Sequence, residues 1–239
     1  MARKIAYAII ALTALLILWV ASRPLMRASS AHVDVDRSRY PVKGIDVSAH
    51  NGAVNYARVA ADTVSFVLAK ASEGVSFRDK KFVMNVESAR RQGLRTGAYH
   101  FFRFDTPGFR QAQNFLRAVD GVVLDFPLII DVEEWGNAET FTTAEVVAEL
   151  REMIDCLNEA GRKVMIYTNK SGYDRFIRFR FDDLPLWVCS LRHEPATSVG
   201  WSLWQHSHKG HVHGVVGDVD LNTFNGDNEE FLDFLFKNT

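Results

Sequence analysis

Short apolar runs alternate with segments of helical periodicity from residue 43 onward, and this alternation limits the fold more than any other feature of the chain. Strands are predicted at 43–48, 65–72, 94–102, 126–133, 163–169, 184–190, 201–207 and 213–222. Helices are predicted at about 79–92, 106–119, 142–161 and 228–236. Five strand–helix units followed by three strands predict an α/β fold, a modified (β/α) barrel over residues 41–239.

Local signals support several of these elements. Thr106 and Pro107 are typical of an N-cap followed by a first-turn proline. Thr142, with Glu145 three residues later, forms a capping box, and Gly161 ends that helix. Residues 126–133 form a continuous apolar run, which predicts a strand buried on both faces.

The N-terminus carries a membrane or secretion signal. Arg3 and Lys4 precede residues 5–21, which contain no charged side chain in seventeen positions. A helix of that length covers roughly 25 Å, near the lower limit for crossing a bilayer. Residues 1–22 are therefore predicted to be a signal anchor, or else a signal peptide cleaved near Ser29–Ala31. Residues 23–40 are expected to be a linker, and either alternative sends the remaining chain out of the cytoplasm.

Charge and cysteine content exclude some classes of function. Residues 1–27 carry four basic side chains and no acid, which leaves 24 basic and 29 acidic residues in the remainder. A mildly acidic body argues against nucleic acid as a partner, because phosphate binding needs clustered Lys and Arg. The two cysteines, Cys156 and Cys189, are too few for a disulfide framework, and they do not have zinc-ligand spacing.

Four acidic residues fall near the ends of predicted strands, where barrels of this class carry their active sites. They are Asp46, Asp131, Glu133 and Asp220. Asp131 and Glu133 are two residues apart on one buried strand, so both side chains face the same way with Cα atoms about 6.6 Å apart. Two acids in one dry space repel, and at least one pKa should be raised. Glu134 faces the other way and is expected to be structural.

Aromatic side chains gather near the same strand ends. Sugar rings stack on aromatic rings, so Tyr99, Tyr167 and Trp204 are candidates for a cleft, whereas Phe101 and Trp201 are expected in the core. Glu73 lies near Lys70, and the pair forms either a local ion pair or a contact to substrate at the rim.

Histidines are concentrated in one predicted hairpin, around a turn at Lys209-Gly210. His206, His208, His211 and His213 are separated by two, three and two residues, which puts some of them on opposite faces. A solvated turn is expected rather than a metal site, although a metal-dependent polysaccharide hydrolase or deacetylase is a competing hypothesis. His100 is equally consistent with a structural and with a cleft position.

The ordered motifs resemble glycoside hydrolase family 25, the lysozyme-type N-acetylmuramidases. The matching segments are GIDVSAHNG (44–52), FVLAKASEG (66–74), GLRTGAYHFF (93–102), PLIIDVE (127–133), VMIYTN (164–169), PLWVCSL (185–191), WSLWQHS (201–207) and GDVDLNTF (217–224). The resemblance implies a barrel of five βα units with three extra strands, and cleavage of the β-1,4 bond between N-acetylmuramic acid and N-acetylglucosamine in peptidoglycan. It departs from the usual pattern at Ser72 and at Cys189-Ser190.

The resemblance also implies roles for individual residues. Glu133 takes the place of the general acid, Asp131 that of the second essential acid, and Asp46 and Asp220 those of the remaining cleft acids. Contacts to sugar are implied for Tyr99, Tyr167 and Gln205. Asp131 either orients the substrate's 2-acetamido group as nucleophile or stabilises charge while water attacks.

The chemistry requires no metal or cofactor, and the expected partners are the peptidoglycan glycan strand and, through the N-terminal helix, the membrane. We expect a monomer at the cell envelope, acting in local wall remodelling. A non-catalytic peptidoglycan-binding module on the same barrel is the alternative function.

Overall fold

The computed structural model describes residues 33–238. The predicted signal anchor at 1–22 and most of the predicted linker lie outside these residues. Within residues 33–238, no helix has both the length and the apolar character needed to cross a membrane.

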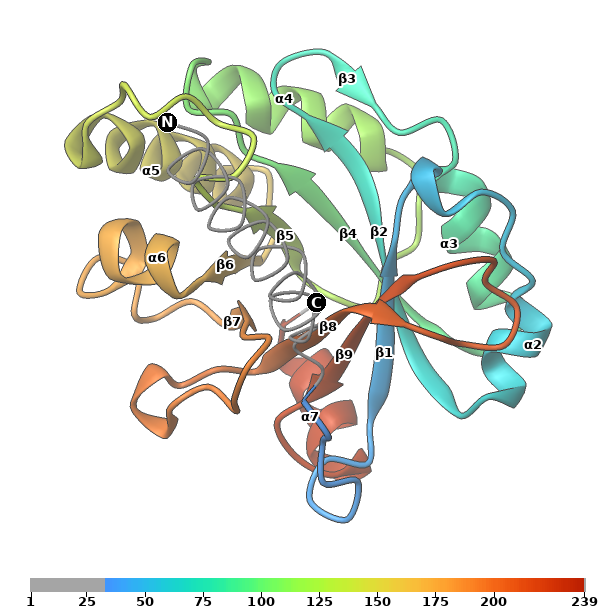
Figure 1. The fold of residues 1–239 in the computed structure, drawn as a ribbon. Helices are drawn as coiled ribbons and strands as arrows, with labels where there is room; N and C mark the ends of the chain where they lie inside the picture. The colour runs from blue at the N-terminus through green and yellow to red at the C-terminus, as the bar shows by residue number, and fades with distance from the viewer. Residues whose placement is uncertain (1–32, 239) are drawn as a thin grey trace, which may run out of the picture. The chain divides into compact units, whose positions relative to one another are not determined.

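One sheet of nine strands forms the centre of the fold, and the pairing of β1 with β2 closes it into a barrel (Figure 1). The strands are β1 (Lys43–Val47), β2 (Val64–Glu73), β3 (Phe77–Arg78), β4 (Arg95–Phe101), β5 (Leu128–Asp131), β6 (Val164–Asn169), β7 (Leu186–Cys189), β8 (Leu203–Gly210) and β9 (Val219–Phe224). The order is β1-β9-β8-β7-β6-β5-β4-β2-β3, so β3 lies outside the ring of eight. The predicted closed barrel of mixed α/β content is confirmed.

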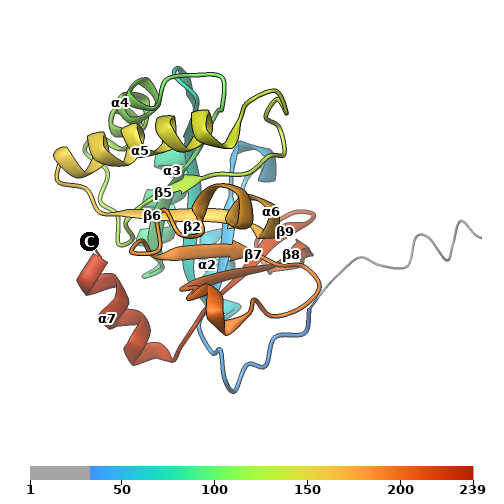
Figure 2. The same cartoon turned by 90° about the vertical axis from the view of Figure 1, so that its left-hand side faces the viewer.

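Helices follow each of the first five barrel strands and lie around the outside of the ring (Figures 1 and 2). They are α2 (Tyr56–Ala61), α3 (Phe82–Arg90), α4 (Gly108–Val119), α5 (Thr143–Glu159) and α6 (Lys170–Gly172), and α7 (Asn228–Asn238) ends the fold. Short turns of 3₁₀ or π geometry are η1 (Ala49–Asn51), η2 (Tyr173–Ile177) and η3 (Thr197–Val199). Sequence periodicity did not predict α2, α6 or β3, which are too short to show a clear period.

The last strand differs from its prediction in place, whereas its antiparallel pairing with β8 agrees with the predicted hairpin. It was expected at 213–222, whereas β9 spans Val219–Phe224 and runs antiparallel to both β8 and β1. The connection between β8 and β9 is longer than the predicted two-residue turn, because Lys209 and Gly210 still belong to β8. Residues 211–218 form that connection, and Gly214 and Gly217 adopt positive φ within it.

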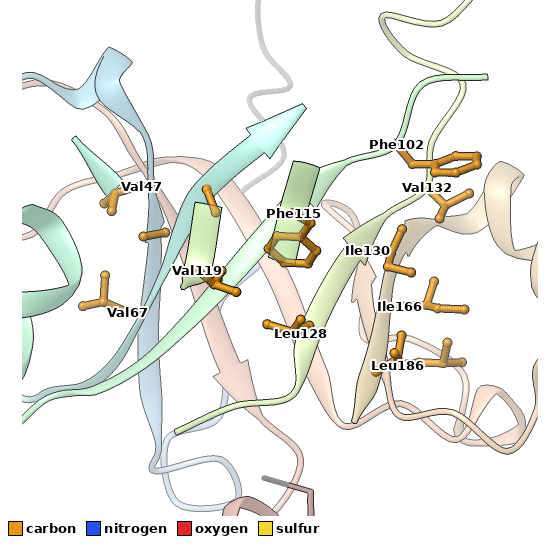
Figure 3. Packing of buried hydrophobic residues seen from close by; sticks show 14 of the residues in the cluster. Val47, Val67, Phe102, Phe115, Val119, Leu128, Ile130, Val132, Ile166 and Leu186 are labelled. Carbon is orange, nitrogen blue, oxygen red and sulfur yellow. The ribbon is translucent and has the colours of Figure 1, made fainter. Parts of the chain in front are cut away.

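Two apolar layers stabilise the barrel. The inner layer fills the end of the ring opposite the carboxyl ends of the parallel strands. There, Phe66 and Phe126 meet Phe231 of α7 at ring-centroid distances of 5.6 and 5.9 Å. The outer layer packs the helices on the strands, and Figure 3 shows Phe115 and Val119 of α4 beside Leu128 and neighbouring strand residues. The first layer closes one end of the barrel and leaves the other end open for a site.

Residues 33–40, part of the segment expected to be a linker, pack against the outside of the barrel. Val33 and Val35 contact the outer apolar layer, and Tyr40 is buried against Trp201 at a centroid distance of 5.5 Å. The Tyr40 hydroxyl donates a hydrogen bond of 2.7 Å to Glu194 in the β7–β8 connection, and Arg39 lies 3.3 Å from the same carboxylate. The segment also reaches β8 and β9, because the Arg37 guanidinium lies 3.3 Å from both His206 and Thr223.

The N-terminus of α4 is capped from a neighbouring helix rather than by Thr106. The helix begins at Gly108 after an N-cap at Pro107 that provides no side-chain hydrogen bond. Glu149 of α5 accepts from the Gly108 amide at 2.7 Å, and Glu152 accepts from Phe109 at 3.1 Å. The carboxylates satisfy amides that the helix itself leaves unpaired. The predicted capping box of Thr142 and Glu145 is confirmed at the start of α5.

Replacing Gly108 with Ala is expected to destabilise the protein by about 1–3 kcal/mol, because overpacking strains a close helix contact. A Cβ atom at this position would lie 1.8 Å from the Glu149 carbonyl oxygen, so the two helices would have to separate. Urea unfolding measures the change. Arg110→Ala, exposed on the same helix, should change stability by less than about 0.5 kcal/mol. Equal stability of Gly108→Ala and the wild type would contradict the close packing.

Candidate active site

A cleft opens at the end of the barrel where the parallel strands finish. Its volume is about 1210 Å³, and it is lined from nearly every barrel strand or the residues that follow it. The carboxyl groups at its floor are Asp46, Asp131, Glu133 and Asp220. The sequence therefore placed all four predicted acids in one cleft, as the convergence of strand ends in a barrel requires.

Asp131 and Glu133 come from the end of β5 and both face the cleft. Burial raises the pKa of Glu133 to about 7, although the Asn169 amide, 3.4 Å from its Oε2 atom, lowers it in part. Burial first, and then the charge of Glu133, raise the pKa of Asp131 well above its ordinary value, against the opposing effect of the Lys70 ammonium. The buried Asp131 Oδ1 atom accepts no hydrogen bond within the described part of the chain.

Asp46 and Asp220 form a second pair of acids, directly opposite each other on β1 and β9. Burial is the main cause that raises the pKa of each, and the charge of Asp220 adds to the effect on Asp46. Asp220 was predicted at the end of its strand, but it is the second residue of β9. It reaches the cleft because β9 runs antiparallel, so the start of this strand lies beside the ends of the parallel ones.

Gln205 joins the two aspartates. Its Nε2 atom donates hydrogen bonds of 2.9 Å to Asp46 and 3.2 Å to Asp220. Its Oε1 atom accepts from the Tyr167 hydroxyl at 2.7 Å and lies 2.9 Å from His208 Nε2. Asn222 adds a further donor to Asp46 at 2.8 Å. Gln205 lines the cleft as predicted, but its amide is engaged by protein groups on both sides, so the geometry favours a role in holding the acids.

Most of the predicted aromatic residues line the cleft, with one clear exception. Tyr99 and Tyr167 lie on its wall together with Trp187, whose indole donates to Asn222 at 2.9 Å. Trp204 points to the opposite side of β8, where it packs against Trp201 in the outer apolar layer. Its prediction failed because neighbouring Gln205 takes the inward position. Phe101, expected in the core, lies in the cleft wall.

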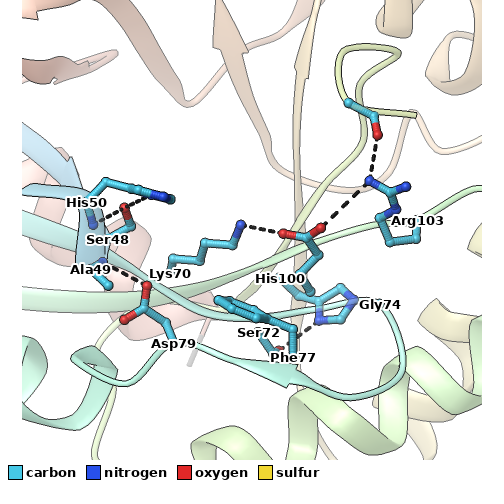
Figure 4. A network of polar contacts seen from close by, with 12 residues as sticks. Ser48, Ala49, His50, Lys70, Ser72, Gly74, Phe77, Asp79, His100 and Arg103 are labelled. Atoms are coloured by element: carbon cyan, nitrogen blue, oxygen red, sulfur yellow. Dashed lines mark hydrogen bonds and ion pairs between the residues drawn. The ribbon is translucent and has the colours of Figure 1, made fainter. Parts of the chain in front are cut away.

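Lys70 lines the cleft, whereas Glu73 lies beside it rather than in it. The Lys70 ammonium contacts Glu73 at 2.7 Å and lies 5.2 Å from the centre of the Phe101 ring. Of the two sequence interpretations, the ion pair is therefore observed. Figure 4 shows Lys70 in this network, together with His100 bonded to Ser72.

The histidines have separate environments. His206, on β8, is buried near Arg37, whereas His208 lines the cleft. His211 and His213 are exposed, and they lie near Asp218 and Asp62, respectively. In residues 33–238, no three His, Cys, Asp or Glu side chains are arranged to hold a metal ion. His100 is structural, because Ser72 and Gln111 occupy its two ring nitrogens and burial lowers its pKa to about 3.

Comparison with known proteins identifies the family. The model of glycosyl hydrolases family 25 matches residues 45–215. The chain belongs to glycosyl hydrolase family 25. It is 34% identical over 203 residues to the uncharacterized protein YegX of Escherichia coli K12, covering 82% of this chain and 74% of that one. It is 32% identical over 201 residues to lysozyme M1 of Streptomyces globisporus, covering 77% and 68%.

Solved structures of the family share the fold. A family 25 glycosyl hydrolase from Bacillus anthracis superposes with a TM-score of 0.77 at 33% identity, covering 85% of this chain and 97% of that one. The similarity extends over nearly all of the barrel that positions the four acids.

Several residues of this family 25 cleft were not singled out from the sequence as site residues. Asn169 and Cys189 follow the inward-facing residues Tyr167 and Trp187 at a spacing of two, so strand alternation was a usable signal. Trp135 and Arg192 lie beyond the strand ends, in connections whose course the sequence pattern does not reveal.

Replacing Asp131 with Asn is expected to stabilise the family 25 domain at pH 7. Its pKa is raised by folding, so the folded state disfavours the charged form, and this cost grows as pH rises above the unfolded value near 4. The neutral amide avoids the cost, which we expect to be on the order of 1 kcal/mol. Thermal unfolding at pH 4 and pH 7 measures the difference.

Glu134→Gln is the control with the opposite sign. Hydrogen bonds from Ser171 and Arg175 lower the pKa of Glu134, so its contribution to stability is present above the unfolded value and is lost as pH falls. Asp131→Asn should gain stability relative to the wild type between pH 4 and pH 7, and Glu134→Gln should lose it. A pH-independent difference for Asp131→Asn would contradict the electrostatic account.

Proposed function

We propose that the protein is a peptidoglycan hydrolase that cleaves the β-1,4 bond between N-acetylmuramic acid and N-acetylglucosamine, with Glu133 as the general acid. The observation that carries the proposal is the pair of buried, convergent carboxyl groups Asp131 and Glu133 in the cleft of a family 25 barrel. Relatives named lysozymes, such as lysozyme M1, support the same reaction class.

Glu133 has the properties of a proton donor. Burial favours its neutral form, and its raised pKa of about 7 keeps much of it protonated at neutral pH. In the proposed reaction, Glu133 gives its proton to the glycosidic oxygen while the bond from that oxygen to the anomeric carbon breaks. The sugar ring then develops positive charge as an oxocarbenium-like species.

Asp131 is assigned to stabilise that positive charge. The Lys70 ammonium opposes the rise in the pKa of Asp131, and so favours the ionised form that this role requires. Asp131 acts on the developing charge directly or through the 2-acetamido group of the substrate. Gln205 and Asn222 keep Asp46 in place beside Asp220 on the opposite wall, and Tyr99 and Tyr167 supply aromatic surface for sugar.

The substrate also suggests where the enzyme works. Peptidoglycan lies outside the cytoplasm, and the uncharged residues 5–21 provide a route for export. We propose a signal anchor in residues 1–22, followed by a linker that ends where residues 33–40 pack on the barrel, with a monomeric enzyme held at the cell envelope. The formal charge of −5 on the part after residue 27 suits local remodelling of the wall better than attack on distant anionic walls.

Glu133→Gln is expected to lower kcat/KM on peptidoglycan about 100-fold or more, because proton donation to the leaving oxygen is lost. The wild-type rate should fall as pH rises through about 7, where Glu133 ionises. A pH profile of muropeptide release measures both effects.

Glu134→Gln is the matched control for this prediction. It removes a neighbouring carboxylate that does not line the cleft and that is bound by Arg175 and Ser171. Its activity, and the fall in its rate as pH rises through about 7, should remain close to those of the wild type. A Glu133→Gln variant with wild-type activity would exclude Glu133 as the acid.

The identity of the cleaved bond is a separate prediction. Digestion of purified peptidoglycan, followed by reduction and mass spectrometry, should reveal new reducing ends of N-acetylmuramic acid. New N-acetylglucosamine ends would contradict the assigned bond. Binding of peptidoglycan without any release by the folded wild type would support the alternative, a non-catalytic binding module.

A further inference from the structure

An exposed tryptophan stands two residues beyond Glu133, on the same side of the chain. Glu133 faces the cleft, Glu134 turns outward to Arg175, and Trp135 returns to the cleft lining. The Trp135 side chain is 76% exposed, although tryptophan is among the most apolar residues by area. A large apolar surface left open beside a site indicates a contact that forms with a ligand.

The loop that carries Trp135 is held firmly. The Asn137 side chain accepts from the Phe104 amide at 2.9 Å and donates to the carbonyl groups of Phe102 and Glu133 at 3.0 Å each. The same loop therefore fixes the backbone at Glu133 and the position of Trp135. Gly136 takes the turn with φ of +75°, a conformation that L side chains rarely adopt.

A chain of charged groups links this loop to the other wall of the cleft. Lys70 contacts Glu73 at 2.7 Å, and Glu73 lies 3.7 Å from Arg103. Arg103 in turn donates to the Gly136 carbonyl at 2.5 Å. Figure 4 shows these contacts from Lys70 to Arg103. The turn after Trp135 is thus held by groups that do not cover the indole.

The indole has only one aromatic neighbour within the described residues. Its ring stands perpendicular to Phe101, with the centroids 6.4 Å apart. Phe101 is only 5% exposed, but it lines the same cleft as Trp135, so the indole is part of the cleft wall. Because hydrogen bonds already hold the loop, a ligand meets this surface at little ordering cost.

We propose that Trp135 is an aromatic platform for a further N-acetylhexosamine ring of a β-1,4-linked glycan strand, next to the sugars flanking the scissile bond. This inference rests on the proposed function and extends it to chain length. A pyranose ring presents an apolar C–H face to the indole, and the continuity with the cleft identifies the occupant as the same strand. The platform selects long strands over short ones.

Binding to the inactive protein tests the proposal. Glu133→Gln protein, with and without Trp135→Ala, is titrated calorimetrically with glycan strands of four and of eight alternating N-acetylglucosamine and N-acetylmuramic acid units. Trp135→Ala is expected to weaken binding of the longer strand about five- to tenfold, as expected for loss of one aromatic contact. Trp135→Phe should recover part of the loss, and the shorter strand should show a smaller change.

Phe236→Ala is the matched control, because Phe236 is 86% exposed on α7 at the closed end of the barrel. It should leave binding of both strands unchanged. In the active protein, Trp135→Ala should raise KM for long strands and leave kcat close to the wild type. If Trp135→Ala weakened binding of both strands equally, or of neither, the platform would be overturned. Release of muropeptides by the wild type would still support the hydrolase in that case. If the inactive protein bound neither strand and the wild type released no muropeptides, both the proposed function and the platform would be contradicted.

Discussion

The parallel pairing of β1 with β2 is the contact on which the site depends, because it closes the sheet. Asp46 lies on β1 and Asp131 on β5, positions far apart in an open sheet of this order. Closure brings both to one end of the ring, while α7 fills the other end with Phe231 and Leu235. One strand pairing therefore brings the two pairs of acids together in a single cleft floor.

That floor is electrostatically unfavourable, and the surrounding groups limit the cost. Burial disfavours charge on all four acids. Neutral amides from Gln205 and Asn222 stabilise Asp46, whereas Lys70 is the cation that acts on Asp131. Donors without charge hold an acid in place and leave it able to exchange a proton, which a tight ion pair with Arg would prevent. Glu134, bound by Arg175, illustrates the contrasting case.

The sequence correctly predicted elements that have a local pattern. The predictions were wrong for features that tertiary contacts determine. Strand alternation placed Asp131 and Glu133 on one face, and apolar runs located the barrel strands to within a few residues. The connection that precedes β9 is set by tertiary contacts, so this strand begins later than predicted, and Asp220 lies at its start rather than at its end. Trp204 was misplaced because strand-end position was given more weight than its parity relative to Gln205. The cap of α4 comes from α5, 41 residues away, and no local motif encodes it.

Residues 33–40 precede the first strand, and they contact the wall of the cleft. Tyr40 and Arg39 hold Glu194, which follows the cleft residues Arg192 and His193 directly. A chain that begins at residue 41 would keep every barrel strand, but this wall of the cleft would lose the contacts of Arg39 and Tyr40. The structural boundary of the domain thus precedes its first strand, and the loss of residues 33–40 would disturb the cleft wall while leaving the strands of the sheet intact.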